Sequence, residues 1–278
     1  MDRPLREIAS CQTVVMGVLN VTPDSFSDGG RYVDTASAVG HARAMAAAGA
    51  HVVDVGGESS RPGAAPLDPE EEQARVLPVL EALAAAHIPF SIDTYHAETA
   101  RRALALGACM VNDITALRGD AAMAEVVAEA GCDCVLMHML GTPRTMQQAP
   151  QYDDVMGDIC RFFEERIRYA ATLGVREEAI WLDPGFGFGK KPAHNLELLR
   201  RLAEFQRFGR PILVGTSNKS TIGAVLDAAV DDRMEGTAAT VAVAIAHGAS
   251  AVRVHDVKRM ARVARMSDAI VRLAYSGG

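Results

Sequence analysis

Eight short apolar runs recur along the chain, rich in Val, Ile and Leu and with little alternation between apolar and polar positions. A strand covered on both faces has such an uninterrupted pattern, whereas a strand with one solvated face alternates. The pattern therefore predicts eight buried strands, at Thr13–Asn20, His51–Gly56, Pro89–Asp93, Cys109–Asp113, Cys134–His138, Ala179–Asp183, Pro211–Gly215 and Ala251–His255.

Amphipathic stretches separate these runs, with apolar residues spaced three and four apart as on one face of a helix. Acidic residues Glu70, Glu71 and Glu72 open one of them, which suits the positive end of a helix dipole. The predicted helices are Thr35–Ala48, Pro69–Ala86, His96–Leu106, Asp120–Ala130, Asp153–Leu173, Asn195–Phe208, Arg233–His247 and Asp256–Ala274.

Strands and helices alternate eight times, and this order predicts an α/β protein with a closed parallel barrel, the (β/α)8 TIM barrel. The alternative is an open doubly wound sheet with an extra layer. We favour the barrel because eight units fill the chain without remainder. No low-complexity linker or change in composition divides the sequence, so residues 1–278 are predicted to form one domain.

The composition of the chain argues against nucleic acid and membranes as partners. The chain has 278 residues and a net charge of −7, so it has no overall attraction for nucleic acid or for an anionic membrane. Five scattered cysteines do not suggest a disulfide framework, and no apolar run is long enough to span a membrane. The first ten residues lack the apolar stretch of a signal peptide. These features predict a soluble, cytoplasmic protein.

Every predicted strand ends in a polar or ionisable group or in a glycine-rich turn. In barrels of this type, functional residues collect at the carboxyl ends of the strands. The complete ring, rather than any single member, indicates a functional site. Its members are Asn20, Gly57-Glu58, Asp93, Asn112-Asp113, His138, Asp183, Ser217-Asn218-Lys219, and Arg253 with His255.

Two carboxylates and a carboxamide in this ring, Asp93, Asn112 and Asp183, suit the edge of a flat heterocycle. A carboxylate accepts two hydrogen bonds side by side, and Asn both donates and accepts. The alternative is structural: Asp93 would cap the following helix, and Asp183 would hold its own Pro-Gly turn.

The last two strands end in groups that suit an anion. The segment Gly215–Ser220 leads into a helical stretch, whose free backbone amides favour negative charge. Alternation places Arg253 and His255 on one face of their strand, where they suit phosphate or pyrophosphate. The alternatives are a plain helix cap and a structural ion pair. The histidines show no spacing typical of a transition-metal site.

Two long loops follow the first two predicted strands, at Asn20–Gly30 and Gly57–Gly63. Both are rich in Gly, Pro and Ser, a composition typical of flexible loops that can act as lids.

Seven segments carry a resemblance that covers most of the chain, from about Val14 to His255. They are Met16–Gly30, Asp54–Gly63, Ser91–Thr94, Val111–Ile114, Asp183–Lys190, Ser217–Ser220 and Val252–Asp256. In this order they resemble the pterin-binding dihydropteroate synthase family. The resemblance implies condensation of p-aminobenzoate with 6-hydroxymethyl-7,8-dihydropterin pyrophosphate, with Mg2+. It also implies a sulfonamide target and a homodimer formed through the last helices.

The resemblance further implies roles for individual residues. Pterin binding falls to Asp93, Asn112, Met137, Asp183, Phe188, Gly215, Lys219 and Arg253. Pyrophosphate binding falls to Asn20, Arg61, Arg253 and His255, with Asn20 acting through the metal. The p-aminobenzoate site is formed by Phe26, Ser60, Arg61, Pro62, Lys219 and Ser220. The catalytic residues are Asp24, Arg61, Lys219 and Arg253.

Two positions depart from the family's commonest pattern. Asn218 stands where Arg is usual, and Ser60 stands where Thr is frequent. Both lie near the p-aminobenzoate end, so they put the affinity for that substrate and for sulfonamides in question.

Three other functions stay open on the sequence alone. A corrinoid-dependent methyltransferase that binds methyltetrahydrofolate also has Ser-Asn after its seventh strand, although Lys219 and the loop after the first strand favour the synthase. The others are a pterin-binding paralogue without activity and a phosphate-binding barrel of central metabolism.

Overall fold

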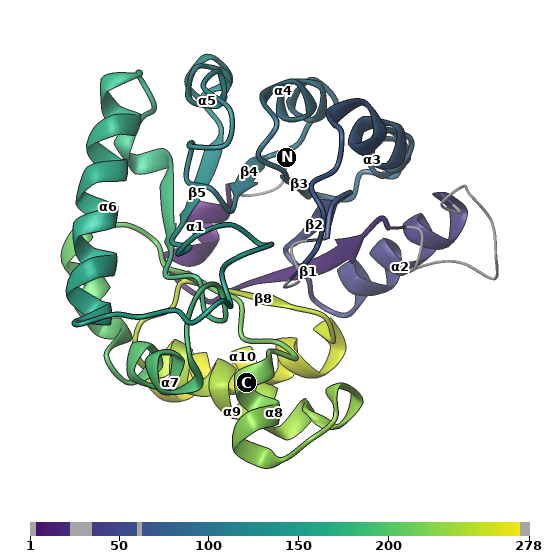
Figure 1. Cartoon of the computed structure of the whole chain (residues 1–278). Helices are drawn as coiled ribbons and strands as arrows, with labels where there is room; N and C mark the ends of the chain where they lie inside the picture. The colour runs from purple at the N-terminus through teal and green to yellow at the C-terminus, as the bar shows by residue number, and fades with distance from the viewer. Residues whose placement is uncertain (1–3, 23–34, 60–62, 273–278) are drawn as a thin grey trace.

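A computed structural model describes residues 4–22, 35–59 and 63–272 of the chain. Eight parallel strands form one sheet in the order β6-β5-β4-β3-β2-β1-β8-β7. A further parallel bridge pairs Leu182 in β6 with Ile212, just before β7, and so brings the two edges together. The strands surround a common centre and the helices cover the outside (Figure 1). The predicted (β/α)8 barrel is confirmed.

The strands follow the predicted apolar runs closely. They are β1 (Val14–Asn20), β2 (Val52–Gly56), β3 (Phe90–Asp93), β4 (Met110–Asp113), β5 (Asp133–Met137), β6 (Ile180–Asp183), β7 (Leu213–Val214) and β8 (Ala251–Val254). Nearly all of their residues are buried, as expected for strands that pack against helices outside and against one another inside.

The helices of the outer layer also match the prediction, with differences at their ends. The longer ones are α2 (Thr35–Ala47), α3 (Pro69–Ala85), α4 (Ala97–Ala105), α5 (Met123–Ala130), α6 (Val155–Thr172), α7 (Pro192–Arg200), α9 (Met234–Ala246) and α10 (Val257–Val271). The short elements are α1 (Leu5–Ala9), α8 (Ser220–Leu226), η1 (Glu177–Ala179), η2 (Leu202–Phe208) and η3 (Val230–Asp232).

Two helix predictions were wrong in detail. The predicted helix Asn195–Phe208 is α7, which begins at Pro192 and ends at Arg200, followed by the 3-10 segment η2. The predicted helix Asp120–Ala130 begins only at Met123, because Asp120 uses its carboxylate to accept hydrogen bonds from the backbone N–H groups of Ala97 and Ala122.

The interior of the barrel is apolar at one end and polar at the other. At the amino ends of the strands, Val14, Met16, Val52, Trp181 and other residues form a buried cluster with Leu5 and Ala9 of α1. The helix α1 thus closes this end, and Arg6 adds an ion pair with Asp133 at the start of β5 (2.7 Å). The carboxyl ends of the strands are left to the polar residues of the predicted site.

Candidate functional site

A buried carboxylate, Asp54 of β2, organises the polar layer inside the barrel. One oxygen accepts a hydrogen bond from Ser91 Oγ (2.6 Å), and the other accepts from Asn112 Nδ2 (2.9 Å) and Arg253 Nε (2.6 Å). Asp54 is fully buried. The layer therefore joins β2, β3, β4 and β8 and fixes the carboxamide of Asn112 and the guanidinium of Arg253.

Arg253 also contacts a second carboxylate, since its Nη2 lies 2.7 Å from Asp93 Oδ2. Burial raises the pKa of Asp93 to about 7, and the neighbouring Arg253 opposes this rise. Asp93 therefore points into the barrel and does not cap α4, whose N-cap residue is His96. Arg253 thus forms the structural ion pair that the sequence left as an alternative.

Asp183 and Lys219 form the opposite part of the site, at the ends of β6 and β7. Asp183 accepts a hydrogen bond from the backbone N–H of Gly185 (2.7 Å), so it also holds its own turn. Burial raises the pKa of Asp183 to about 6, and that hydrogen bond and Lys219 oppose the rise. Desolvation, followed by Arg253, lowers the pKa of Lys219 to about 8. Burial thus moves both pKa values toward neutral pH.

An apolar wall faces this charged set. Ile114, Met137, Met139, Met146 and Phe188 form a buried cluster at the barrel mouth, and Tyr95 packs against it. Lys219 Nζ lies 4.2 Å from the centre of the Phe188 ring. An apolar surface beside hydrogen-bonding groups suits a flat ring with polar edges, which stacks through its face and is recognised through its rim.

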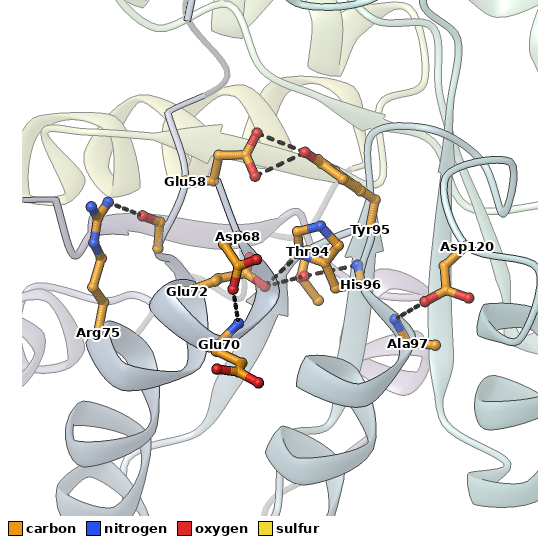
Figure 2. Close-up of polar contacts among 11 residues, drawn as sticks. Glu58, Asp68, Glu70, Glu72, Arg75, Thr94, Tyr95, His96, Ala97 and Asp120 are labelled. Atoms are coloured by element: carbon orange, nitrogen blue, oxygen red, sulfur yellow. Dashed lines mark hydrogen bonds and ion pairs between the residues drawn. The ribbon is translucent and has the colours of Figure 1, made fainter. Parts of the chain in front are cut away.

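Acidic and aromatic side chains continue the site toward the end of β2 (Figure 2). The Tyr95 hydroxyl lies 2.8 and 2.9 Å from the two carboxylate oxygens of Glu58. Glu72 of α3, 1% exposed, accepts from Thr94 Oγ1 and contacts His96 Nδ1, each at 2.9 Å. A crevice of about 10 Å³, room for a single water molecule, is lined by Glu58, Glu72, Asp93, Thr94, Tyr95 and Ile114. The network ties the start of the loop after β2 to β3 and α3.

The end of β7 is held by side chains of α9 and its neighbourhood. Asn218 has a left-handed backbone (φ 59°), its N–H donates to Thr237 Oγ1, and its carbonyl accepts from Arg233 Nη1 (3.0 Å). Ser217 Oγ lies 3.0 Å from Nδ1 of the exposed His255. The sequence predicted a helical stretch after Gly215–Ser220 without giving its bounds, and helix α8 begins at Ser220.

The structure brings most of the predicted site residues to one end of the barrel. Asp93, Asn112, Met137, Asp183, Phe188, Lys219 and Arg253 line its interior or its mouth, and Asn20, Gly215, Ser220 and His255 lie at or just beyond strand ends. Asp24, Phe26, Ser60, Arg61 and Pro62 lie outside the described residues, as do residues 23–30 of the first predicted lid loop and 60–62 of the second.

Sequence reasoning missed three residues of the site. Asp54 stands in the middle of a valine-rich strand, and an acid at a position facing the barrel interior was the available signal. Lys190 was only part of a motif, yet it is 2% exposed and bonded to a loop. Tyr95 carries no sequence pattern that would single it out.

Asn20 is the residue that the resemblance assigns to the metal. No group of three or more His, Cys, Asp or Glu side chains suited to a metal ion occurs within the described ranges. Asn20 supplies one carboxamide oxygen at the end of β1. Mg2+ commonly takes only one or two protein oxygens and completes its shell with water and substrate phosphates, so this residue fits the ion.

Comparisons with known proteins agree with this fold and site. A family model described as pterin binding enzyme matches residues 16–255. The dihydropteroate synthase of Escherichia coli K12 is 48% identical over 256 residues, covering 92% of this chain and 90% of that protein. The dihydropteroate synthase of Mycobacterium leprae is 48% identical over 251 residues, covering 88% of each.

Solved structures give the same result. Yersinia pestis dihydropteroate synthase with a sulfonamide drug superimposes with a TM-score of 0.89, at 44% identity and over 94% of this chain and 95% of that one. The Xanthomonas albilineans enzyme with 4-aminobenzoic acid has a TM-score of 0.87 at 42% identity, over 93% of each chain. The chain therefore belongs to the pterin-binding enzyme family and, within it, to the dihydropteroate synthases, which are transferases of folate biosynthesis.

Across the residues that the structure describes, none of the helices combines the length and apolar character needed to cross a membrane.

Proposed function

We propose that the chain joins p-aminobenzoate to 6-hydroxymethyl-7,8-dihydropterin pyrophosphate, giving 7,8-dihydropteroate and pyrophosphate. The observation that carries the proposal is the pairing of the apolar wall at Phe188 with the polar groups of Asn112, Asp183 and Lys219. A Xanthomonas albilineans dihydropteroate synthase structure contains 7,8-dihydropteroate, the product expected here.

The pterin would lie with its face against the wall and its polar edge toward the strand ends. Asp183 and Asn112 would pair with its ring N–H and acceptor groups, since one offers carboxylate oxygens and the other a carboxamide. Lys219, above the Phe188 ring, would donate to a ring acceptor. Asp93 and Arg253, joined at 2.7 Å, would lie beside the pterin and the pyrophosphate. Met137 and Gly215 complete the proposed pterin contacts.

The reaction breaks the bond between the pterin methylene carbon and the pyrophosphate oxygen and forms a bond from that carbon to the arylamine nitrogen. The amine is already a nucleophile, and the proton that it loses passes to solvent, so no strong general base is required. Positive charge on the methylene would be stabilised by the electron-rich ring and by Asp93 and Asp24. Negative charge on the departing pyrophosphate would be neutralised by Arg253, His255 and Arg61.

Mg2+ is proposed as the cofactor, held at the protein by Asn20 and otherwise by the substrate, and it supplies charge neutralisation to the pyrophosphate. For the arylamine, Phe26, Ser60, Arg61, Pro62, Lys219 and Ser220 are the proposed contacts. Lys219 and Ser220 stand at the start of α8, beside Asn218.

The first experiment measures product and pyrophosphate release from both substrates, with and without Mg2+. Release that requires both substrates and the metal supports the synthase. Tight pterin binding without release would instead favour a paralogue without activity or a methyltransferase, which assays with methyltetrahydrofolate and a corrinoid acceptor would distinguish. A cytoplasmic location stays a prediction.

A homodimer is also proposed, through α9 and α10. These two helices pack against each other and carry exposed apolar side chains. Each of these side chains is 41–66% exposed, and they are Val243, Met266, Ile270 and Val271. Exposed apolar side chains of this kind often form a subunit interface. Ile270→Glu is expected to shift the protein to a monomer in sedimentation experiments, because it places a charge in the interface. The exposed Val225→Glu on α8 is the matched control. A dimer of unchanged affinity in Ile270→Glu would contradict the assignment of this face.

A further inference from the structure

The loop after β6, residues 184–190, winds back on itself at three glycines. Gly185, Gly187 and Gly189 all have positive φ (67°, 85° and 62°), which L side chains rarely adopt. A Cβ on Gly185 would lie 1.9 Å from the His138 carbonyl oxygen, so backbone and backbone are in direct contact there. The winding turns the carbonyls of Gly185 and Phe188 toward a common point inside the loop.

Lys190 fills that point. Its Nζ lies 3.0 Å from Gly185 O, 3.1 Å from Phe188 O and 2.9 Å from His138 Nδ1. The His138 carbonyl lies 3.4 Å away, so four acceptors surround the three hydrogens of an ammonium. Burial lowers the pKa of Lys190 to about 7, and Asp183 opposes this fall. The side chain is 2% exposed. Lys190 is therefore a donor to the protein itself and has no hydrogen left for a substrate.

His138 completes the arrangement from the end of β5. Its backbone N–H donates to the Asp183 carbonyl (2.9 Å), and its ring packs edge-on against Phe162 with centroids 4.9 Å apart. Burial, followed by the charge of Lys190, lowers the pKa of His138 well below its usual value. Both causes favour the neutral ring, whose Nδ1 can accept from a Lys190 ammonium when the ring proton is on Nε2.

Phe188 is the side chain that this loop presents to the site. Its carbonyl is held by Lys190, and its ring lies over Lys219 Nζ at 4.2 Å within the apolar wall. Separate contacts support the rest of the loop, from Asn195 Oδ1 to Gly187 N and from Tyr152 Oη to Gly189 O (both 2.9 Å). Among the contacts of the described residues, Lys190 alone joins the carbonyls of both Gly185 and Phe188 to His138, which follows β5.

We infer that Lys190 is a positioning residue for the pterin end of the site: it fixes the loop so that Phe188 lies against Lys219 and the bound ring. This inference rests on the proposed function. It predicts that loss of Lys190 impairs use of the pterin substrate and leaves use of p-aminobenzoate nearly intact. A residue of purely structural importance would instead lower the amount of folded enzyme and leave both KM values unchanged.

The test compares Lys190→Met with Lys191→Met, an exposed lysine one position along. In the folded Lys190→Met enzyme, the pterin KM should rise by about tenfold or more, and the p-aminobenzoate KM should change by less than about twofold. Lys191→Met should match the wild type. An unchanged pterin KM, or equal changes in both KM values, would overturn the inference. If Lys190→Met does not fold, Lys190→Gln replaces it, because Gln keeps a shorter, neutral donor. The same two KM values are then compared with those of the wild type.

A double substitution tests the route through Phe188. If Lys190 acts by placing that ring, Phe188→Ala with Lys190→Gln should bind dihydropterin about as weakly as Phe188→Ala alone, whereas independent effects would multiply and count against the inference. Binding is followed by fluorescence titration of the dihydropterin pyrophosphate. Because this readout needs no turnover, it separates the inference from the proposed function: a wild type without product formation would refute only the latter.

Discussion

Two aspartates of the site are held in surroundings that favour their protonated forms. Burial raises the pKa of Asp93 to about 7 and that of Asp183 to about 6, despite nearby cations. Ionisation of a buried carboxylate costs less when a ligand donates hydrogen bonds to it, so these two groups suit a ligand with N–H donors. The free energy of unfolding of the ligand-free chain is therefore lower than it would be with neutral groups at these positions.

Asp183→Asn should stabilise the ligand-free protein at pH 8. The raised pKa means that the folded state binds this proton more tightly than the unfolded state, so stability falls as pH rises from 3.8 through about 6 and stays reduced above that. The amide removes the penalty and keeps an acceptor for Gly185 N–H. Urea denaturation should show a gain of about 1–3 kcal/mol at pH 8, shrinking as pH falls toward 4.

The exposed Asp231→Asn serves as the control for this measurement and should change stability by less than about 0.5 kcal/mol. The same Asp183→Asn variant should lose affinity for the pterin. A loss of stability at pH 8, or a gain that does not depend on pH, would show that the buried carboxylate is not the source of the penalty.

Asn218→Arg tests the residue that departs from the family pattern. Asn tolerates the left-handed backbone at this position (φ 59°), whereas Arg pays about 1 kcal/mol or more for it. A cation here would lie near the proposed carboxylate site of p-aminobenzoate. Steady-state kinetics should therefore show a larger change in the p-aminobenzoate KM than in the pterin KM. Equal changes in both would contradict that placement.

Individual residues differ in how far the sequence could identify them. Asp93, Asp113 and Asp183 are the last residues of their strands, and Asn112 is next to last. Because the carboxyl ends of barrel strands meet at one face, the sequence could place Asp93, Asn112 and Asp183 near one another. The partnership of Asp54 with Arg253 joins residues 199 positions apart in sequence. It depends on the register of eight strands around the barrel, which no local pattern contains.

At the scale of elements, the strands were predicted to within a few residues because buried strands in a parallel barrel are simple apolar runs. Short elements were missed for physical reasons. Helix α1 has five residues, too few for a periodic pattern, and its helical state depends on packing under the barrel. The segment η2 has helical composition, but its tight turns are chosen by packing of Leu202 and Phe205 into the core.

The loop after β6 behaves as one element, and Gly185→Ala should disrupt it. The new methyl would meet the His138 carbonyl at 1.9 Å and would occupy a position with φ 67°. Gly209→Ala is a matched control, because Gly209 has φ 61° but open space around it. Denaturation should show a loss of about 1 kcal/mol for Gly209→Ala from backbone strain alone, and clearly more for Gly185→Ala, with weaker pterin binding only in the latter. Equal losses would indicate that the close contact relaxes freely.

Across the whole molecule, the two ends of the barrel divide stability from function. The amino ends of the strands enclose an apolar cluster closed by α1, and the carboxyl ends hold buried charges that pair with one another. An apolar plug stabilises by area removed from water, while buried ion pairs contribute little net stability. The fold therefore takes its stability mainly from the apolar end of the barrel and from the outer core. The polar end can hold buried charged residues that serve the reaction and add little stability.

Leu5→Ala tests this division. Leu5 is 5% exposed and packs in the cluster at the amino ends of the strands, at the opposite end of the barrel from the site. Its truncation should lower the free energy of unfolding by about 2–4 kcal/mol, through lost burial and the cavity left behind. The exposed Leu226→Ala, the same change at a residue 50% exposed, should cost much less. Below the unfolding transition, kcat and both KM values of Leu5→Ala should equal those of the wild type, because Asp54 and its partners take their positions from the strands and not from α1. A changed pterin KM in folded Leu5→Ala would mean that the plug also sets the polar layer, and the two ends of the barrel would then have to be treated as one coupled unit.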